Sequence, residues 1–296
     1  MSSSIMQRMH HLGGSRLLRR SKSNPMNCFF STTSKNKPDL PIMANVVQGP
    51  SLLLTTLHRP SPSLMLVPGL RSLPFWTSSD NRVAYQDPTV TRIVEHLQKN
   101  ASAIAKEYSA VAPTIPSDYD VSEKGGEHAD DSLHTGSWDW HSFLLQGTVQ
   151  RNFAKHFPTT ATVLTDIGPD LFTETPFGFC FFSKLAADSA IAAHTSPINF
   201  RLRIHLALDV PAAASDDKDA AAAAAVGIRV GPVTQEWKSG EALVLDDSYE
   251  HEVWNKTKEE RVVLLVDIWH PDVKRSEREE IVRMFGHAKQ QGWLNK

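Results

Sequence analysis

Residues 199–210 alternate between polar and apolar side chains, and this alternation constrains the fold more than any other stretch of the chain. Successive side chains of a β-strand point to opposite faces of a sheet, so the pattern predicts a strand with two unlike faces. One face carries Arg201, Arg203 and His205, and the other carries Leu202, Ile204 and Leu206. The basic groups fit either surface charges on a half-exposed strand or a polar pocket inside a barrel. The solid aliphatic face opposite them favours the pocket.

Several further short strands follow in the C-terminal half. We predict them at residues 177–182, 226–233, 242–246 and 262–269, each rich in β-favouring side chains and bounded by polar residues. His251 and Val253 also alternate with Glu252 and Trp254. Short strands separated by turns predict an antiparallel sandwich or barrel.

Helices are expected at the flanks of this β-rich region. Apolar residues recur near a 3.6-residue period over residues 88–110, and Asp87 before Pro88 is typical of a helix start. A terminal amphipathic helix is predicted after Val273. Between these helices, residues 115–133 are predicted to be a polar loop, and the alanine-rich residues 212–225 a solvent-exposed insertion.

The N-terminal residues have a different composition from the rest of the chain. Residues 1–79 contain nine Lys or Arg residues and a single acidic one, Asp39. Such basic, acid-poor, Ser-rich composition is typical of a transit peptide, so we expect a mitochondrial or plastid protein. If the leader is only a disordered tail, a cytoplasmic location follows instead. We therefore divide the chain into a transit peptide and linker, 1–72, and a folded domain, 73–296.

Overall charge and cysteine content exclude several classes of protein. A formal net charge of −2 gives no reason to expect nucleic acid as a partner. Cys28 and Cys180 are too few for a disulfide framework or a zinc cluster. No apolar run reaches the roughly 18 residues that a transmembrane helix needs, so no transmembrane segment is predicted.

Two of the thirteen histidines stand out by their context. His194 and His251 each border a strand-like run and are 57 residues apart, far enough to bring two edges of a barrel together. Imidazole suits non-haem Fe(II), whose oxygenases need protein ligands on one face only. Position 196, where a carboxylate ligand would follow His194, is Ser196, and a hydroxyl is a poor iron ligand. From spacing alone, the metal-site interpretation and a purely structural role for these histidines both stay open.

Basic residues near the histidines could serve a dicarboxylate co-substrate. The distal carboxylate of 2-oxoglutarate requires a permanent cation, and the planar fork of arginine binds both carboxylate oxygens. Arg261 opens the strand after His251, while Arg203 and His205 share one strand face after His194. Asp246 and Asp247, just before His251, fit either a turn or a partner that orients the imidazole.

Two long stretches of the sequence resemble the aspartyl/asparaginyl β-hydroxylases. The stretches are residues 194–206, which begin His-Thr-Ser-Pro-Ile-Asn, and residues 245–255, which contain Asp-Asp-Ser-Tyr-Glu-His. Arg261 and residues 266–271 complete the pattern, and the resemblance extends over roughly residues 73–273.

The resemblance implies a mainly β fold with flanking helices, specifically a double-stranded β-helix (a cupin-like jelly roll). It also implies Fe(II) as cofactor and 2-oxoglutarate and O2 as co-substrates. By this resemblance, the iron ligands are His194 and His251. The residue that pairs with the distal carboxylate is Arg261, and further co-substrate contacts come from Ser183, Arg203 and His205. Animal members of the family have glycine where this chain has Ser196, with water completing the shell of the iron.

The sequence also departs from the animal members. Leu144 stands where they have an aromatic neighbour of the co-substrate, and the cysteines of their disulfide loop are missing. Their disulfide-rich substrate class is therefore not carried over. We expect hydroxylation of an aspartyl or asparaginyl side chain of a protein, or of a related C–H bond such as that of a lipid acyl chain. The alternatives are an inactive barrel that binds a metal or small carboxylate, and a cupin enzyme that does not use 2-oxoglutarate.

Overall fold

The computed structural model describes residues 65–76, 87–118, 133–211 and 225–293. The predicted insertion at 212–225 falls outside these ranges except for its last residue. Most of the predicted leader and Cys28 also lie outside them. Among the residues that are described, no helix is both long and apolar enough to cross a membrane.

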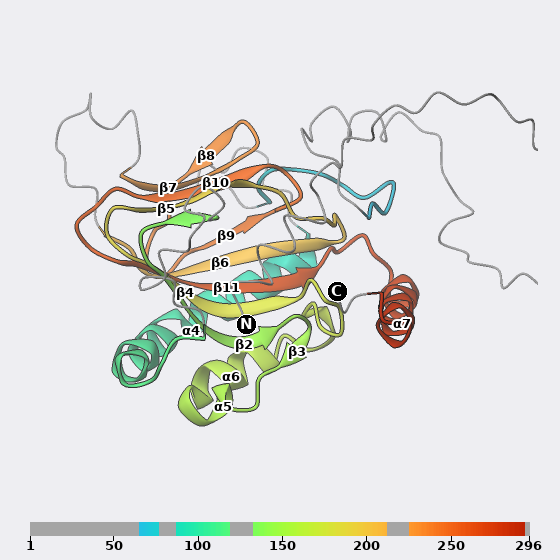
Figure 1. The fold of residues 1–296 in the computed structure, drawn as a ribbon, viewed down its shortest axis with the longest axis horizontal. Coiled ribbons are helices and arrows are strands. Elements are labelled where there is room, and N and C mark those ends of the chain that lie inside the picture. Colours follow the sequence, from blue (N-terminus) through green and yellow to red (C-terminus); the bar gives the residue numbers. More distant parts are fainter. Residues whose placement is uncertain (1–64, 77–86, 119–132, 212–224, 294–296) are drawn as a thin grey trace, which may run out of the picture.

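The strands of the described residues form two antiparallel sheets that lie face to face (Figure 1). The larger sheet has the order β3 (Thr148–Val149), β2 (Trp138–Leu145), β4 (Phe179–Leu185), β11 (Arg261–Trp269), β6 (Arg201–Asp209) and β9 (Ala242–Leu245). The smaller sheet has the order β1 (His134–Thr135), β5 (Ser189–His194), β10 (His251–Asn255), β7 (Val226–Val230) and β8 (Val233–Gln235).

The chain passes back and forth between the two sheets from β4 onward. β4, β6, β9 and β11 lie in the larger sheet, whereas β5, β7, β8 and β10 lie in the smaller one. This winding is that of a double-stranded β-helix, or jelly roll. The predicted fold, mainly β with flanking helices, is confirmed.

Four strands escaped the sequence prediction: the two-residue strands β1 and β3, and the longer strands β2 and β5. β2 has a register shift between Ser142 and Leu144 and is buried on both faces, so it lacks a period of two. β5 reads Ser-Ala-Ile-Ala-Ala-His and owes its conformation to pairing with β10 rather than to its own propensity, because alanine is a weak strand former.

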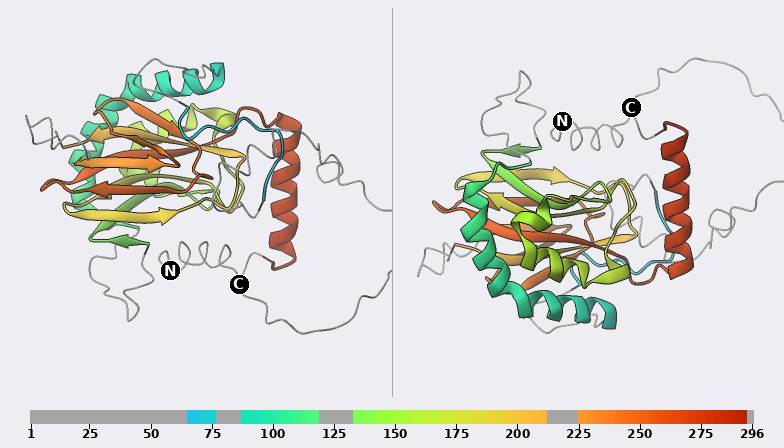
Figure 2. Two further views of the ribbon diagram at one scale, coloured as in Figure 1. Left: turned by 90° about the horizontal axis from the view of Figure 1, so that it is seen from above. Right: turned by 90° about the horizontal axis from the view of Figure 1, so that it is seen from below.

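Helices cover the outer face of the larger sheet (Figure 2). The helices are α4 (Pro88–Val111), the 3-10 turns Ala112–Thr114 and Gly168–Asp170, α5 (Phe153–His156) and α6 (Pro158–Thr165). The Asp87 side chain accepts a hydrogen bond from the N–H group of Thr89 at 2.9 Å. This bond caps the start of α4, as the Asp87-Pro88 pair predicts. Leu202, Ile204 and Leu206 of β6 share one hydrophobic core with the buried stripe of α4.

The opposite face of β6 looks into the space between the sheets, where a second hydrophobic core lies. Arg201, Arg203 and His205 are only 3%, 7% and 6% exposed. The basic side chains therefore line the interior of the barrel and are not surface charges, because the smaller sheet covers them.

A third core closes one end of the barrel. The helix α7 (Arg275–Gln290) lies at this end (Figure 2). It packs Ile281 and Phe285 against aromatic side chains that include Phe177 and Trp269. Residues 65–76 lie across the same end, where Met65 and Val67 join this core. The packed part of the chain thus begins before residue 73.

Candidate metal and co-substrate site

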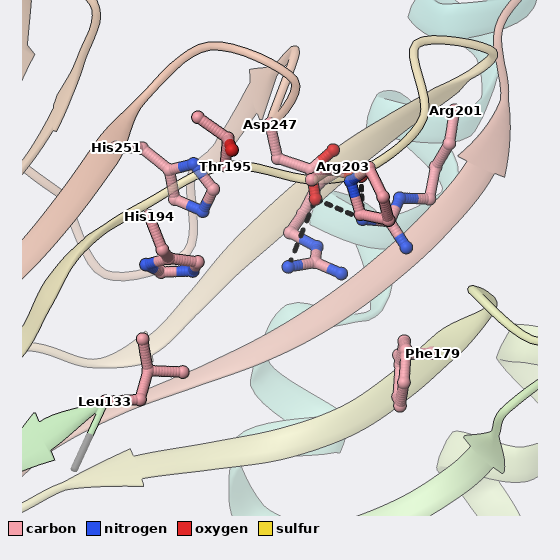
Figure 3. Close-up of a pocket in the computed structure, with 10 residues that line it drawn as sticks. Leu133, Phe179, His194, Thr195, Arg201, Arg203, Asp247 and His251 are labelled. Carbon is pink, nitrogen blue, oxygen red and sulfur yellow. Dashed lines mark hydrogen bonds and ion pairs between the residues drawn. The ribbon is translucent and has the colours of Figure 1, made fainter. Parts of the chain in front are cut away.

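The two predicted histidines lie side by side in the smaller sheet. His194 ends β5, His251 begins β10, and the two are paired directly in the register of these strands. Their ring centroids are 4.1 Å apart (Figure 3). Strand pairing therefore brings together two residues that are 57 positions apart in the sequence.

Each imidazole is oriented by its own strand. The Nδ1 of His194 hydrogen-bonds to the Ala192 carbonyl at 2.7 Å, and that of His251 to the Tyr249 carbonyl at 3.0 Å. A carbonyl oxygen can only accept, so Nδ1 carries the proton and Nε2 presents the lone pair that a metal needs. Burial lowers the pKa of His251, although Asp247 opposes this, and the neutral ligand form is favoured.

Ser196 takes part in a charged network instead of supplying a ligand. Its hydroxyl accepts from Nη2 of Arg201 at 3.1 Å, and its N–H group donates to the Asp247 carbonyl at 2.8 Å. Within the described ranges, no group of three or more His, Cys, Asp or Glu side chains is arranged to hold a metal. A metal bound here would have the two histidines as its protein ligands.

Four charged side chains form a buried network beside the histidines, and Figure 3 shows three of them, Arg201, Arg203 and Asp247. Asp267 accepts from Arg203 Nε at 2.8 Å and from Arg201 Nη1 at 3.0 Å. Asp247 is paired with Arg201 and, at 3.3 Å, with Arg203. Burial alone would raise the pKa of Asp247, but the two arginines lower it to about 2. The network is neutral overall, which makes its burial tolerable.

Sequence reasoning missed the part that Arg201 and Asp267 play in this network. The sequence did indicate a role for Asp267, because it is the acidic residue in an otherwise apolar strand. It is also an even number of positions from Arg261, so the two side chains lie on the same face of the strand. Nothing local distinguished Arg201 from Arg203, since both lie on the same strand face.

A pocket opens between the histidines and this network. Its lining includes Leu133, Phe179, Thr195, Pro197, both histidines, both arginines and Asp247 (Figure 3). Oδ1 of Asp247 is buried and has no hydrogen-bond partner among the described residues. Such an oxygen is able to accept a hydrogen bond from a group that occupies the pocket.

Arg261 lies deep in the same interior, and no carboxylate in the described part of the chain pairs with it. It is 1% exposed, and its Nε has no hydrogen-bond partner within the described part of the chain. Nη1 reaches the Ser183 carbonyl at a long 3.5 Å, and the guanidinium lies 4.9 Å from the centroid of the Trp237 ring. Burial lowers the pKa of Arg261 to about 9. Buried cations of this kind are normally paired, so the surroundings of Arg261 suit an anion.

Ser183 and His205 line the same interior as Arg261. The Ser183 hydroxyl accepts from Nε1 of Trp138 at 2.9 Å. The His205 ring stacks on Trp237 with centroids 5.9 Å apart, and neither ring nitrogen has a partner among the residues described. Burial, with Arg261 and Arg203 nearby, holds the pKa of His205 well below its ordinary range. Trp237, which sequence reasoning missed, links Arg261 to His205.

Leu144 lies on the other side of the sheet. It is fully buried in the core that β2 shares with the helices, together with Cys180 and Phe182. The aromatic side chains that face the interior are instead Trp138 and Trp140. The resemblance set Leu144 beside the co-substrate. In the structure, the register shift in β2 instead turns this side chain away from the space between the sheets and toward the helices.

A jelly roll with a histidine pair on its smaller sheet, and with a buried arginine that has no carboxylate partner among the described residues, defines a cupin-like protein. The particular family follows from the sequence, because a family model described as aspartyl/asparaginyl beta-hydroxylase matches residues 98–271. The chain belongs to this family.

Relatives within the family differ in their named substrates. The chain is 31% identical to the human aspartyl/asparaginyl beta-hydroxylase over 74% of its own length and 26% of the relative. It is 37% identical to the ornithine lipid ester-linked acyl 2-hydroxylase of Rhizobium tropici over 45% of its own length and 42% of the relative. The matched region thus spans less than half of either relative.

Solved structures give weaker similarity. One is a 2OG-Fe(II) oxygenase family oxidoreductase from Burkholderia pseudomallei, at 13% identity and a TM-score of 0.37 over 61% of this chain and 90% of that chain. Another is a prolyl-4-hydroxylase from Pseudomonas putida, at 13% identity and a TM-score of 0.31, over 61% of this chain and 98% of that chain. The fold assignment therefore rests on the strand order itself.

Proposed function

We propose that this protein is an Fe(II)- and 2-oxoglutarate-dependent dioxygenase that hydroxylates an aspartyl or asparaginyl side chain of a protein. In the overall reaction, substrate, O2 and 2-oxoglutarate give hydroxylated substrate, succinate and CO2. The observation that carries the proposal is Arg261, a buried cation without a carboxylate partner in the described residues, inside the same barrel as the histidine pair.

His194 and His251 would hold the iron, which when bound supplies the activation of O2. The fit is supported by the two Nδ1 hydrogen bonds, which leave Nε2 of each ring as the coordinating atom. Asp247 would accept a hydrogen bond from a molecule in the pocket through Oδ1. Burial lowers the pKa of His251 and favours its neutral ligand form.

Arg261 would bind the distal carboxylate of 2-oxoglutarate and thereby gain a counter-ion that the described residues do not supply. Ser183 is near enough to share that carboxylate, since its carbonyl already contacts Arg261. His205 and Arg203 lie along the barrel between Arg261 and the histidines on the inner face of β6. They would orient the rest of the co-substrate.

A lipid substrate is the second candidate, favoured by the 37% identity to an enzyme named for acyl 2-hydroxylation. The apolar part of the pocket lining, with Leu133, Phe179 and Pro197, is compatible with an acyl chain as well as with a peptide. We rank the protein substrate first because the match to the human relative covers more of this chain.

An inactive barrel is the main rival to both enzymatic functions. Loss of activity would remove the reason to keep an uncompensated charge in the interior, since an apolar residue of similar volume is commonly as stable or more so. Arg261 is nevertheless fully buried, and no carboxylate of the described residues pairs with it. This argues against a decayed site, and also against a cupin enzyme that does not use 2-oxoglutarate.

The test is to add Fe(II) and 2-oxoglutarate to the purified full chain without oxygen and to record the visible spectrum. We expect a weak charge-transfer band, followed on admission of O2 by succinate formation with the correct substrate. Peptides containing Asp or Asn and vesicles of amino-acid-linked lipids form two separate arms, each scored by the mass gain of one oxygen atom. Absence of both the band and succinate would reject the oxygenase function.

A further inference from the structure

Residues 65–76, which we call the strap, contact the turn that follows His194. The Met65 N–H group donates to the Pro197 carbonyl at 3.0 Å. The Asn199 side-chain amide pairs with the main chain of Val67 in both directions, at 2.8 Å each. These contacts fix the chain within five residues of His194, at the point where β5 has ended.

The other end of the strap contacts the end of β9 and the turn that precedes His251. The Trp76 N–H group donates to the Val244 carbonyl at 2.8 Å, and the Asp246 N–H group donates to Pro74 at 3.2 Å. The Ser72 hydroxyl hydrogen-bonds to the Tyr249 hydroxyl at 2.9 Å and to the Asp246 carboxylate at 3.3 Å. Tyr249 is also the residue whose carbonyl orients the His251 ring.

The middle of the strap is anchored independently of both turns. Nε of Arg71 donates to Asp272 at 2.7 Å, and its Nη2 donates to Asp87 at 2.8 Å. Nε2 of His270 donates to the Arg71 carbonyl at 2.9 Å. The strap is thereby tied to the end of β11 and to the start of α4, so its two ends are held at a fixed separation.

We propose that the strap positions the two histidines for metal binding, with Ser72 and Asn199 as positioning residues. The inference rests on the proposed function, because it takes His194 and His251 as the metal ligands. Each histidine is at a strand terminus, where local opening is easiest. His194 is paired only with His251, whereas His251 is paired with both His194 and Val230. The strap contacts the turn that adjoins each histidine and so limits the separation of the imidazoles.

Hydrogen exchange in the wild-type full chain tests this without any substitution. Affinity coupling is reciprocal, so Co(II) bound between the histidines must stabilise the strap if the strap stabilises the metal site. We expect exchange of the amides of Met65, Val67 and Trp76 to slow about fivefold or more when Co(II) alone is added. The amides of Thr159 and Thr160, bound by Glu107 at 2.8 Å on the outer face, serve as controls and should not change.

Substitutions provide the second measurement. We expect Ser72→Ala and Asn199→Ala each to weaken Co(II) binding about fivefold, the effect of losing one or two hydrogen bonds of about 1 kcal/mol. Glu107→Gln, which weakens a comparable set of hydrogen bonds far from the histidines, should lower the melting temperature and leave Co(II) affinity unchanged.

The outcomes separate the two proposals. If wild-type protein binds Co(II) but strap amides exchange at the same rate with and without it, and both variants bind Co(II) within twofold of wild type, the strap has no positioning role. That result would leave the proposed function intact. If the wild-type protein binds no Co(II), the metal site itself is wrong, and both proposals fail.

Discussion

His194 and His251 face each other across the β5–β10 pair with ring centroids 4.1 Å apart, and each ring is held by a carbonyl two residues before it. The two imidazoles are therefore oriented in the same way before any metal arrives. The arrangement depends on strand register, because a slip of one residue would turn one of the rings to the opposite face of the sheet.

Replacing either histidine by alanine should abolish tight metal binding. We expect His194→Ala and His251→Ala each to weaken Co(II) affinity at least about a hundredfold in anaerobic calorimetric titration, since one imidazole cannot hold the ion alone. His96→Gln is a suitable control, because His96 contacts the Val163 carbonyl on the outer helical layer. Unchanged Co(II) affinity in a double variant lacking both histidines would show that the metal binds elsewhere.

Arg261→Met should have opposite effects on stability and on co-substrate binding. Removal of a buried charge that has no counter-ion among the described residues should raise the free energy of unfolding by about 1 to 3 kcal/mol. Binding of 2-oxoglutarate should weaken at least about thirtyfold, because its distal carboxylate loses its cation. Thermal melts with and without 2-oxoglutarate measure both effects. A variant that is still stabilised by 2-oxoglutarate as much as wild type would exclude Arg261 from the co-substrate site.

Asp247 should make stability sensitive to acid. Its pKa in the folded state, about 2, is below the ordinary value of 3.8, so its contribution is complete above pH 4 and is lost as pH falls through 2. The shift corresponds to about 2 kcal/mol. Urea unfolding at a series of pH values should show a smaller loss between pH 4 and pH 2 in Asp247→Asn than in wild type. Equal losses would mean that Arg201 and Arg203 do not hold this carboxyl ionised.

Leu144→Trp tests which way β2 faces. The structure places Leu144 in the fully packed helical core, so a larger ring should cost about 1 to 3 kcal/mol through overpacking. Leu144→Met, of similar volume, should cost less. Chemical denaturation compares the two. If Leu144→Trp is as stable as wild type and changes 2-oxoglutarate affinity, the side chain must reach the interior after all.

The sequence by itself determined the elements whose patterns are local. Alternation over residues 199–210 predicted β6 and the two unlike faces of the larger sheet, and Asp87 before Pro88 predicted the start of α4. The same alternation placed Arg203 and His205 on one face. These features follow from the fixed periods of strands and helices, which a single segment displays without reference to the rest of the chain.

Only the tertiary structure decided which residues meet. It showed that β5 forms by pairing despite its alanines. It also showed that the Leu144 side chain points toward the helices and not into the space between the sheets. It also showed that Ser196 and Arg201 join Asp247 and Asp267 in one buried network. The strap contacts likewise link residues more than a hundred positions apart. Such contacts depend on sheet register and on the packing of two layers, and no local pattern records either. Whether a buried charge such as Arg261 has a partner is therefore known only once the barrel is closed.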